Sequence, residues 1–407
     1  MNTAVERHLP ALRHLRHDLH RHPELMFEEK WTGGVVAREL RALGIEPVEG
    51  LGAERAEDSQ KRRGTGVIAL LPATADPAQA PTVALRADMD ALPIIEATGK
   101  DYASTTPGLM HACGHDGHTT MLLGAARVLA ETKSRPNNVV FLFQPAEEGG
   151  AGAEKLVRDG ALDGRLLGKR VDAVFGLHGW PDQPLGTVAI RAGPMLAATD
   201  DYIVTIRGKG GHAAQPHLCV DPIVVTAEII TALQTIVSRR ISPFEPVVIT
   251  IGAVHAGTVN NVIPDTAEFI GTLRTLSPEG RALAETEFKR IVSDIASAHG
   301  ASADINWHRG YPVTRNDERA TETVRRVATR HLGASHLLHR EHPTMGGEDF
   351  AYYSQVVPSA FFFLGLRPAH QASYPGLHTP QFDFNDDALG VGIEMMVGLA
   401  MEEHPGR

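Results

Sequence analysis

Short apolar runs that alternate with helical patterns most constrain how this chain can fold. The strand-like runs cover residues 66–71, 82–87, 138–143 and 173–178. Helical patterns precede the first run at residues 5–20 and 31–43, and another fills residues 118–132, between the second and third runs. This alternation predicts an α/β domain in which helices flank a mixed sheet.

The middle of the chain follows a different order, which predicts a second domain. Strand, helix, strand, strand, helix and strand patterns follow one another at residues 201–208, 221–240, 246–254, 267–275, 278–300 and 303–309. This β-α-β-β-α-β order is typical of a ferredoxin-like domain. The α/β pattern resumes with a helix at 320–331, a strand at 360–365 and a helix near 386–403. We therefore expect a first domain, residues 1–192 and 310–407, interrupted by an inserted domain, residues 193–309.

Composition excludes several classes of protein. The chain has 407 residues, a formal net charge of -10 and no basic stripe, so a nucleic-acid or anionic-membrane partner is not expected. Cys113 and Cys219 are the only cysteines, which excludes a disulfide framework. The N-terminal segment lacks a signal-peptide pattern, and no apolar run approaches roughly 18 residues. A cytoplasmic protein is expected. The charged segment 52–64 is predicted to be an exposed loop.

Several of the strand-like runs end in acidic or histidine side chains. Asp88 and Asp90 follow the second run, Glu147 and Glu148 follow the third, and His178 ends the fourth. In α/β sheets, ligands bind outside the carboxyl ends of the strands. One such acid is more often a helix cap or a solvated turn, but their joint occurrence favours a common cleft.

The segment MHACGHDGHTT, residues 110–120, contains Cys113 and His115 in a C-x-H arrangement. In an extended loop this spacing puts both side chains on one side, and thiolate, imidazole and carboxylate groups are ligands of transition metals. One alternative is a loop whose cysteine is merely buried. Another is a Cys–His nucleophilic pair, which would need an oxyanion hole and would leave the nearby carboxylates unexplained.

Further polar residues lie in loops rich in glycine. Of two adjacent glutamates on a loop, one can bind a metal while the other acts as general base, although an exposed acidic turn is the alternative. His178 and His378 are each bracketed by glycine and proline. His212 lies in the glycine-rich segment 208–217, which lacks the lysine and serine or threonine of a phosphate-binding P-loop.

Nearly the whole chain resembles the metal-dependent N-acyl-amino-acid amidohydrolases. This group includes hippurate hydrolases and plant hydrolases of auxin–amino-acid conjugates. It is a branch of the aminoacylase and glutamate-carboxypeptidase superfamily of two-metal peptidases (peptidase family M20). The blocks that carry the resemblance occur in order and include LRADMDALPI, MHACGHDGHTT, FLFQPAEEGGAGA, GKGGHAAQPH, GGEDFAYY and GLHTPQFDF.

The resemblance implies roles for particular residues. It implies five metal ligands: Cys113, His115, Glu148, His178 and His378. Glu147 is implied as the general base for a metal-bridging water, and Asp90 and Asp88 as residues that orient the ligands. The wider superfamily has a histidine where this sequence has Asp88, a departure that fits the cysteine-containing branch. His212 is implied to enter the site of the partner subunit in a dimer.

The chemistry implied by the resemblance is amide hydrolysis by hydroxide held between two divalent ions of Zn, Mn, Co or Ni. His212 would stabilise the oxyanion, and Asn261 and Arg274 could hold the carboxylate of an N-acyl amino acid, although Arg274 could equally form a structural ion pair. A homodimer through the inserted domain, possibly a tetramer, is implied. The alternatives are a dipeptidase or carboxypeptidase of the same superfamily, and a metal- or ligand-binding module without catalysis, which the presence of Glu147 disfavours.

Overall fold

The computed structural model describes residues 3–404 and divides into two compact units. The larger unit contains the chain up to Met195, the segment Arg315–His342 and the chain from Asp349 onward. The smaller unit contains Leu196–Thr314 and the short segment Pro343–Glu348. An α/β domain interrupted by an inserted domain is therefore the architecture of this chain, as the sequence predicts.

An eight-stranded mixed sheet forms the centre of the larger unit, in the order β1-β2-β4-β3-β5-β16-β6-β15. The central strands β4, β3, β5 and β16 run parallel, whereas β1, β2 and β6 each pair antiparallel with a neighbour. The strands are β1 (Pro47–Leu51), β2 (Gly66–Leu71), β3 (Thr82–Asp88), β4 (Asn138–Gln144), β5 (Ala173–Pro184), β6 (Val188–Ile190), β15 (Leu337–His339) and β16 (Ser359–Arg367).

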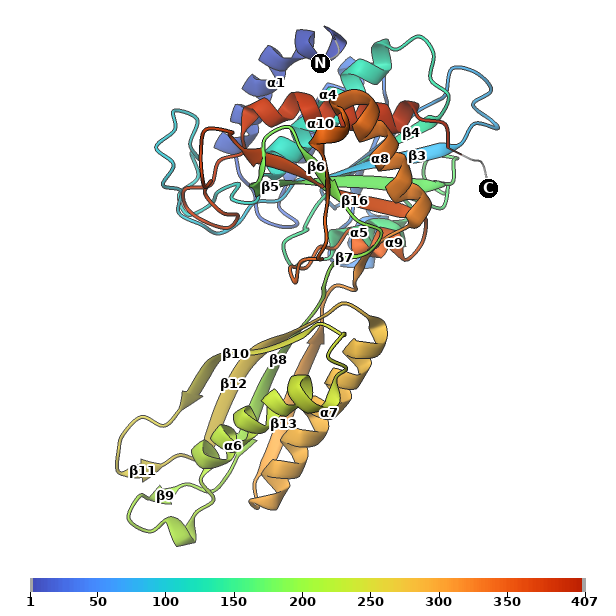
Figure 1. Cartoon of the computed structure of the whole chain (residues 1–407). Helices are drawn as coiled ribbons and strands as arrows, with labels where there is room; N and C mark the ends of the chain where they lie inside the picture. Colours follow the sequence, from blue (N-terminus) through green and yellow to red (C-terminus); the bar gives the residue numbers. More distant parts are fainter. Residues whose placement is uncertain (1–2, 405–407) are drawn as a thin grey trace. The chain divides into compact units, whose positions relative to one another are not determined.

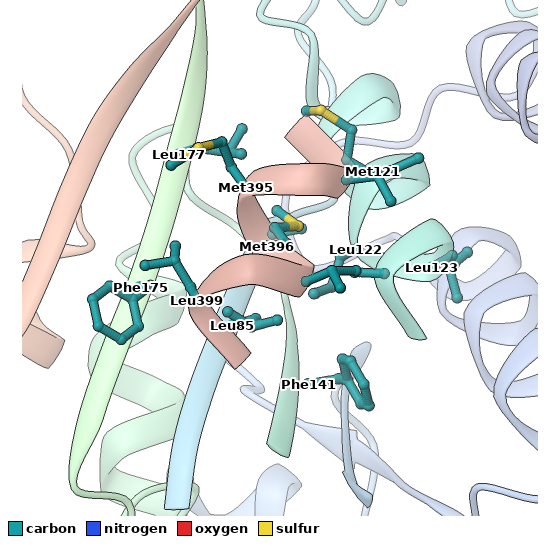
Figure 2. Close-up of a cluster of buried hydrophobic side chains, with 14 of the residues drawn as sticks. Leu85, Met121, Leu122, Leu123, Phe141, Phe175, Leu177, Met395, Met396 and Leu399 are labelled. Atoms are coloured by element: carbon teal, nitrogen blue, oxygen red, sulfur yellow. The ribbon is translucent and has the colours of Figure 1, made fainter. Parts of the chain in front are cut away.

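Helices cover both faces of this sheet, with α1, α4 and α10 on one face and α5 and α9 on the other (Figure 1). The main apolar core lies between α4, α10 and the sheet, where Met121, Leu122, Phe175 and Met396 meet (Figure 2). The helices of this unit are α1 (Thr3–Arg21), α2 (Lys30–Ala42), α3 (Ala56–Gln60), α4 (His115–Glu131), α5 (Gly152–Asp159), α8 (Glu318–Leu332), α9 (Ala351–Ser354) and α10 (Leu389–Met401).

The short helix α3 lies in the charged segment that the sequence predicts to be an exposed loop. Its residue Ser59 is buried, and the Ser59 hydroxyl accepts hydrogen bonds from the Ala53 backbone N–H at 3.0 Å and from Arg158 at 2.9 Å. These bonds fix the segment against α5. They could not be predicted from the sequence, because the segment is charged and has no apolar periodicity.

The inserted domain has the predicted ferredoxin-like topology, with the four strands in the order β10-β12-β8-β13 (Figure 1). Its main elements are β8 (Ala198–Arg207), α6 (Pro222–Thr235), β10 (Val247–Ala256), β12 (Thr266–Thr275), α7 (Pro278–Ala298) and β13 (Ser302–Arg309). A small ladder joins β9 (Gly211–His212) to β11 (Val262–Ile263), and β7 (Gly193–Leu196) pairs with β14 (Thr314–Asn316) where the chain enters and leaves the domain.

The helical segment Pro222–Arg240 is long and apolar enough to cross a membrane by length and composition alone. Helix α6 occupies its first part and buries Val225, Ile229 and Leu233 in the core of the inserted domain. The core of this domain therefore explains part of its apolar character, whereas Ile223, Val224 and Val237 are exposed.

Candidate metal centre

Three neighbouring parallel strands bring polar side chains to one level of the sheet. Asp88 at the end of β3 pairs with Gln144 at the end of β4. Arg86 pairs with Gly176 of β5, so His178, two residues further along β5, lies level with Asp88. Because the strands run parallel, the loops that follow them start at the same edge, as the sequence predicts.

Cys113 lies at the centre of the cluster, in the loop before α4. Its Sγ is 3.3 Å from Nε2 of His178 and 3.3 Å from Nε2 of His378. Nε2 of His378 is also 3.2 Å from Oε1 of Glu148. The structure thus brings together a thiol, two imidazoles and a carboxylate from four separate segments.

His115, the first residue of α4, completes the set of predicted ligands. Its Nδ1 donates to the backbone oxygen of Asp90 at 2.9 Å, which leaves Nε2 as the ring nitrogen that a metal could bind. Nε2 is 4.0 Å from Oε1 of Glu148. Candidate ligand atoms within 4.8 Å of one another form overlapping groups, among them Cys113–His115–His178, Cys113–Glu148–His378 and His115–Glu147–Glu148.

The backbone around these side chains is held in uncommon conformations. Ala146, just before the two glutamates, has a φ of 55°, and His378 has a φ of 60°, in the left-handed region that costs non-glycine residues free energy. The carboxylate of Asp90 accepts from the backbone N–H of Glu147 at 3.0 Å and of Glu148 at 2.9 Å. Asp90 therefore fixes the backbone of the turn that carries the two adjacent glutamates.

Burial and neighbouring charges shift the ionisation of the cluster. Burial, followed by the carboxylates of Glu148 and Glu147, raises the pKa of the Cys113 thiol well above its usual range. Burial opposes the charge of His115, but Asp88 and Asp90 overcome it and raise the pKa of His115 to about 10. Carboxylates thus outweigh cationic side chains around the thiol.

This donor set fits divalent metal ions. Nε2 of His115 and Oε1 of Glu148 are buried and have no hydrogen-bond partner among the described residues. Leaving such atoms unpaired is costly, and each needs an explanation. A divalent cation would replace the proton on Nε2 of His115, bind Oε1 of Glu148 and stabilise the thiolate of Cys113.

Glu147 lies beside this donor set, 7% exposed. Its Oε1 is 3.4 Å from the backbone N–H of Asp349, and it shares a group of candidate ligand atoms with His115 and Glu148. The two glutamates therefore differ in their surroundings, since Glu148 also approaches Cys113 and His378.

Sequence reasoning missed His118, which lies one helical turn after His115. Nδ1 of His118 is 2.7 Å from Oδ1 of Asp88, and its Nε2 accepts from the backbone N–H of Gly179 at 2.9 Å. His118 thus connects the end of β3 with the backbone next to His178. The spacing of three residues between two histidines on one helix was the available signal.

Arg86 and Asp349 were also missed. Arg86 is fully buried in β3 and donates to Asp88 at 2.7 Å, to Asp349 at 3.1 Å and to Gln144 at 2.8 Å. The guanidinium neutralises two carboxylates beneath the cluster and holds the ends of β3 and β4 together. A single arginine in an apolar strand gives little sign of this role.

The remaining predicted residues lie in the inserted domain. His212 in β9 pairs with Val262 in β11, and the backbone N–H of Ala213 donates to the backbone oxygen of Asn261 at 3.1 Å, so His212 and Asn261 lie close together. Nδ1 of His212 accepts from the backbone N–H of Ala214 at 3.0 Å, which leaves the proton on Nε2 of the neutral ring.

Arg274 lies at the other end of the inserted domain. It pairs with Thr199 near the end of β12, whereas the β9–β11 ladder adjoins the start of β12, where Gly210 N–H donates to Asp265 at 2.9 Å (Figure 1). Arg274 lies eight positions after Thr266, a separation of about 27 Å at the rise of an antiparallel strand. Arg274 forms no ion pair with any residue in the described part of the chain. The alternative that Arg274 makes a structural ion pair therefore has no support there.

The fold and the cluster define a two-domain α/β protein with a candidate metal centre at the carboxyl ends of its parallel strands. Comparison with known proteins identifies the family: the chain belongs to peptidase family M20/M25/M40, which matches residues 84–402. It is a hydrolase that acts on amide bonds.

Curated relatives match almost the full chain. N-acetyl-L-cysteine deacetylase of Bacillus subtilis is 42% identical over 92% of this chain and 84% of its own length. Thermostable carboxypeptidase 2 of Saccharolobus solfataricus is 37% identical over 95% of this chain and 94% of its own. IAA-amino acid hydrolase ILR1-like 4 of Arabidopsis thaliana is 36% identical over 95% and 84%.

A solved structure has the same fold. The YXEP protein of Bacillus subtilis, a dinuclear metal-binding peptidase of family M20, superimposes with a TM-score of 0.80. It is 35% identical, and the match covers 97% of this chain and 98% of that one.

Proposed function

We propose that this enzyme hydrolyses the amide bond of N-acyl amino acids with two divalent metal ions, releasing a carboxylate and a free amino acid. The observation that carries the proposal is the convergence of five donor side chains, from four segments of the chain, next to Glu147. The relatives that deacetylate N-acetylcysteine and cleave amino-acid conjugates support this substrate class.

Cys113, His115, Glu148, His178 and His378 would hold the two ions. When bound, Zn, Mn, Co or Ni would supply Lewis-acid activation of a water molecule and of the scissile carbonyl. Nε2 of His115 and Oε1 of Glu148, both buried without a hydrogen bond among the described residues, support this assignment, and Oε1 of Glu148 lies 3.2 Å from Nε2 of His378, another proposed ligand. Asp90 and Asp88 would orient the ligands, since Asp90 bonds to His115 and to both glutamate backbones.

Glu147 would take the proton of the attacking water on its carboxylate and deliver it to the leaving amine. Its low exposure and the N–H of Asp349 beside Oε1 would keep this carboxylate in place. His212, with its proton on Nε2, would donate to the oxyanion that develops on the carbonyl. Arg274 of one subunit, and Asn261 that would enter with His212 from the other subunit, would hold the carboxylate of the substrate.

The length of the inserted domain supports a homodimer. An N-acyl amino acid is much shorter than the distance of about 27 Å that separates the His212 end of β12 from Arg274. The two ends would therefore serve different substrate molecules, as expected if His212 acts in the site of the partner subunit. A homodimer through the inserted domain, possibly forming a tetramer, and a cytoplasmic location stay predictions.

A dipeptidase or carboxypeptidase is the second candidate function. The carboxypeptidase relative favours it, and it would use the same centre. The two candidates differ in the group on the acyl side of the bond, which carries a free amine or a further peptide bond in a peptide. That difference can be measured directly.

The test is metal removal followed by a substrate panel. We expect exhaustive chelation to abolish activity and a divalent ion to restore it, with N-acetyl and N-benzoyl amino acids hydrolysed faster than the matching dipeptides. Full activity at a metal content near zero would contradict the metal assignment. Faster turnover of dipeptides, across Mn, Co, Ni and Zn, would favour the peptidase.

A further inference from the structure

Two arginines, Arg191 and Arg340, lie next to each other at the ends of adjacent strands in the larger unit. β6 and β15 pair in parallel, and Arg191 and Arg340 are the residues that follow them. The backbone N–H of Arg340 is 3.4 Å from the backbone oxygen of Ile190. Nη1 of Arg191 donates to the backbone oxygen of Glu341 at 3.0 Å, which turns its side chain toward the same segment.

Neither guanidinium is neutralised by a carboxylate. Within the described residues, no ion pair of 4.0 Å or less involves Arg191 or Arg340, and Nε of each is buried without a hydrogen-bond partner. Asp182 is an acidic residue close enough to interact electrostatically with Arg340, but the two side chains lie beyond ion-pair distance. Arg191 and Arg340 are partly buried, whereas the fully buried Arg16 and Arg86 both bind carboxylates.

Two aromatic side chains, Trp180 and Phe363, lie between Arg340 and His178 of the candidate metal centre. The rings of Trp180 and Phe363 stack with centroids 4.0 Å apart. Cζ of Arg340 lies 5.4 Å from the Trp180 centroid and 4.7 Å from that of Phe363. The Trp180 ring also packs edge to face with the ring of His178, with centroids 6.0 Å apart.

A carboxylate is the ligand that fits these observations. Stacking on the aromatic rings holds the Arg340 guanidinium, but it satisfies none of the N–H donors and does not neutralise the two adjacent positive charges. Guanidinium forks match the two oxygens of a carboxylate, and one bound anion would offset the repulsion within the pair.

We propose that Arg340 and Arg191 form a subsite for a carboxylate at the far end of the substrate's acyl chain. This inference rests on the proposed function, in which Asn261 and Arg274 take the carboxylate of the amino acid. The apolar face of Trp180 would contact the methylene groups between the scissile amide and the acyl-end carboxylate. The enzyme would then prefer N-acyl amino acids derived from a dicarboxylic acid.

The test compares two substrates with acyl chains of equal length, N-glutaryl and N-pentanoyl derivatives of one amino acid. We expect the metal-loaded wild type to favour the glutaryl substrate in kcat/KM. Arg340→Gln should lower kcat/KM for the glutaryl substrate roughly 10- to 100-fold, the size expected for a lost charged hydrogen bond, and leave the pentanoyl substrate within about twofold. Arg191→Gln should act in the same direction, and Arg340→Lys should restore part of the preference.

Arg165→Gln is the control variant, since Arg165 is exposed and paired with Asp163 away from the centre. It should change neither substrate. No preference in the wild type, or an equal loss on both substrates in Arg340→Gln, would overturn the proposal.

A binding measurement separates this inference from the proposed function. If no N-acyl amino acid is hydrolysed, the proposed function fails, and calorimetric titration with glutarate then decides the subsite. Glutarate binding that Arg340→Gln abolishes would support a carboxylate subsite, and binding unchanged by the substitution would overturn it. Glutarate that binds through Arg340 but does not compete with the pentanoyl substrate would overturn the assignment to the substrate and indicate a separate effector site.

Discussion

At the scale of single residues, the adjacent glutamates have different surroundings. Oε1 of Glu148 lies 3.2 Å from His378 and takes part in the cluster around Cys113, whereas Oε1 of Glu147 faces the backbone N–H of Asp349. This difference in surroundings is consistent with the proposal that Glu148 holds a metal ion and Glu147 moves a proton, and the two roles can be tested separately.

Glu147→Gln should keep its metal and lose about 10²- to 10⁴-fold in kcat, the usual contribution of a general acid–base group. Glu148→Gln should instead lower the metal content, because it removes a charged ligand. Metal analysis and steady-state kinetics on both variants measure the difference. Glu154→Gln, an exposed glutamate of α5, is the control and should leave both quantities unchanged. Exchanged phenotypes would show that the two roles are reversed.

At this scale, the sequence could predict only those residues of the candidate site whose side-chain chemistry is itself typical of metal ligands. Cys113, His115, His178 and His378 are uncommon side chains in motifs, and the structure brings them together. Their supporting residues are ordinary by sequence. Arg86 sits in an apolar strand, and what makes it part of the site is a set of contacts with residues far along the chain, such as Asp349.

At the scale of elements, one buried arginine joins three segments around the candidate centre. Arg16 of α1 donates to Asp383 at 2.9 Å and Asp386 at 2.8 Å, in the segment after His378, and lies 3.4 Å from Asp116 at the start of α4. The guanidinium is fully buried. It therefore links the helix that begins at His115 to the segment that carries His378.

Arg16→Met should destabilise the fold by about 3–5 kcal/mol, since it leaves buried carboxylates without their cation. Arg13→Met is the matched control one turn earlier on α1. Arg13 is exposed and pairs with Asp387 at 2.8 Å, so its loss should cost less than about 1 kcal/mol. Urea unfolding at a fixed metal concentration measures both. Equal losses in the two variants would contradict this role of Arg16.

His20, one turn after Arg16, predicts a dependence of stability on pH. Burial opposes its charge, but hydrogen bonds to Asp116 at 2.8 Å and Glu96 at 3.3 Å raise the pKa of His20 to about 9. Because the folded-state pKa lies above the unfolded value of 6.5, this stabilisation is fully present below pH 6.5 and is lost as the pH rises through about 9.

The difference in unfolding free energy between wild type and His20→Gln should therefore shrink by up to about 3 kcal/mol between pH 6 and pH 10. His14→Gln, on the exposed side of the same helix, should show no such change. A difference that stayed constant over this range would mean that His20 is neutral in the folded state.

At the scale of the whole molecule, the helices and strands and their order can be predicted from the sequence more completely than the structure of the segments that connect them. The β-α-β-β-α-β order specifies the inserted domain because each pattern is long enough to show its period. Helix α3 was missed because its single buried side chain, Ser59, leaves no periodicity. Arg191 and Arg340 are 149 positions apart, and only the pairing of β6 with β15 places them together.

The separation of His212 from Arg274 along the inserted domain leads to a prediction about the assembled enzyme. If His212 acts in the partner's site, His212→Ala and Glu147→Gln variants should each be nearly inactive alone and should complement one another after subunit exchange. One site of each mixed dimer would then contain both an intact Glu147 and an intact His212. A statistical mixture contains half mixed dimers with one good site of two, so activity should reach about a quarter of wild type if the sites act independently.

Mass spectrometry of the mixture should confirm that subunits have exchanged. A matched mixture of Glu147→Gln with Glu148→Gln controls for exchange itself, since both changes lie in the larger unit and a mixed dimer would contain no intact centre. That mixture should stay inactive. Exchange without recovery of activity in the His212→Ala mixture would place His212 in the site of its own chain or outside catalysis.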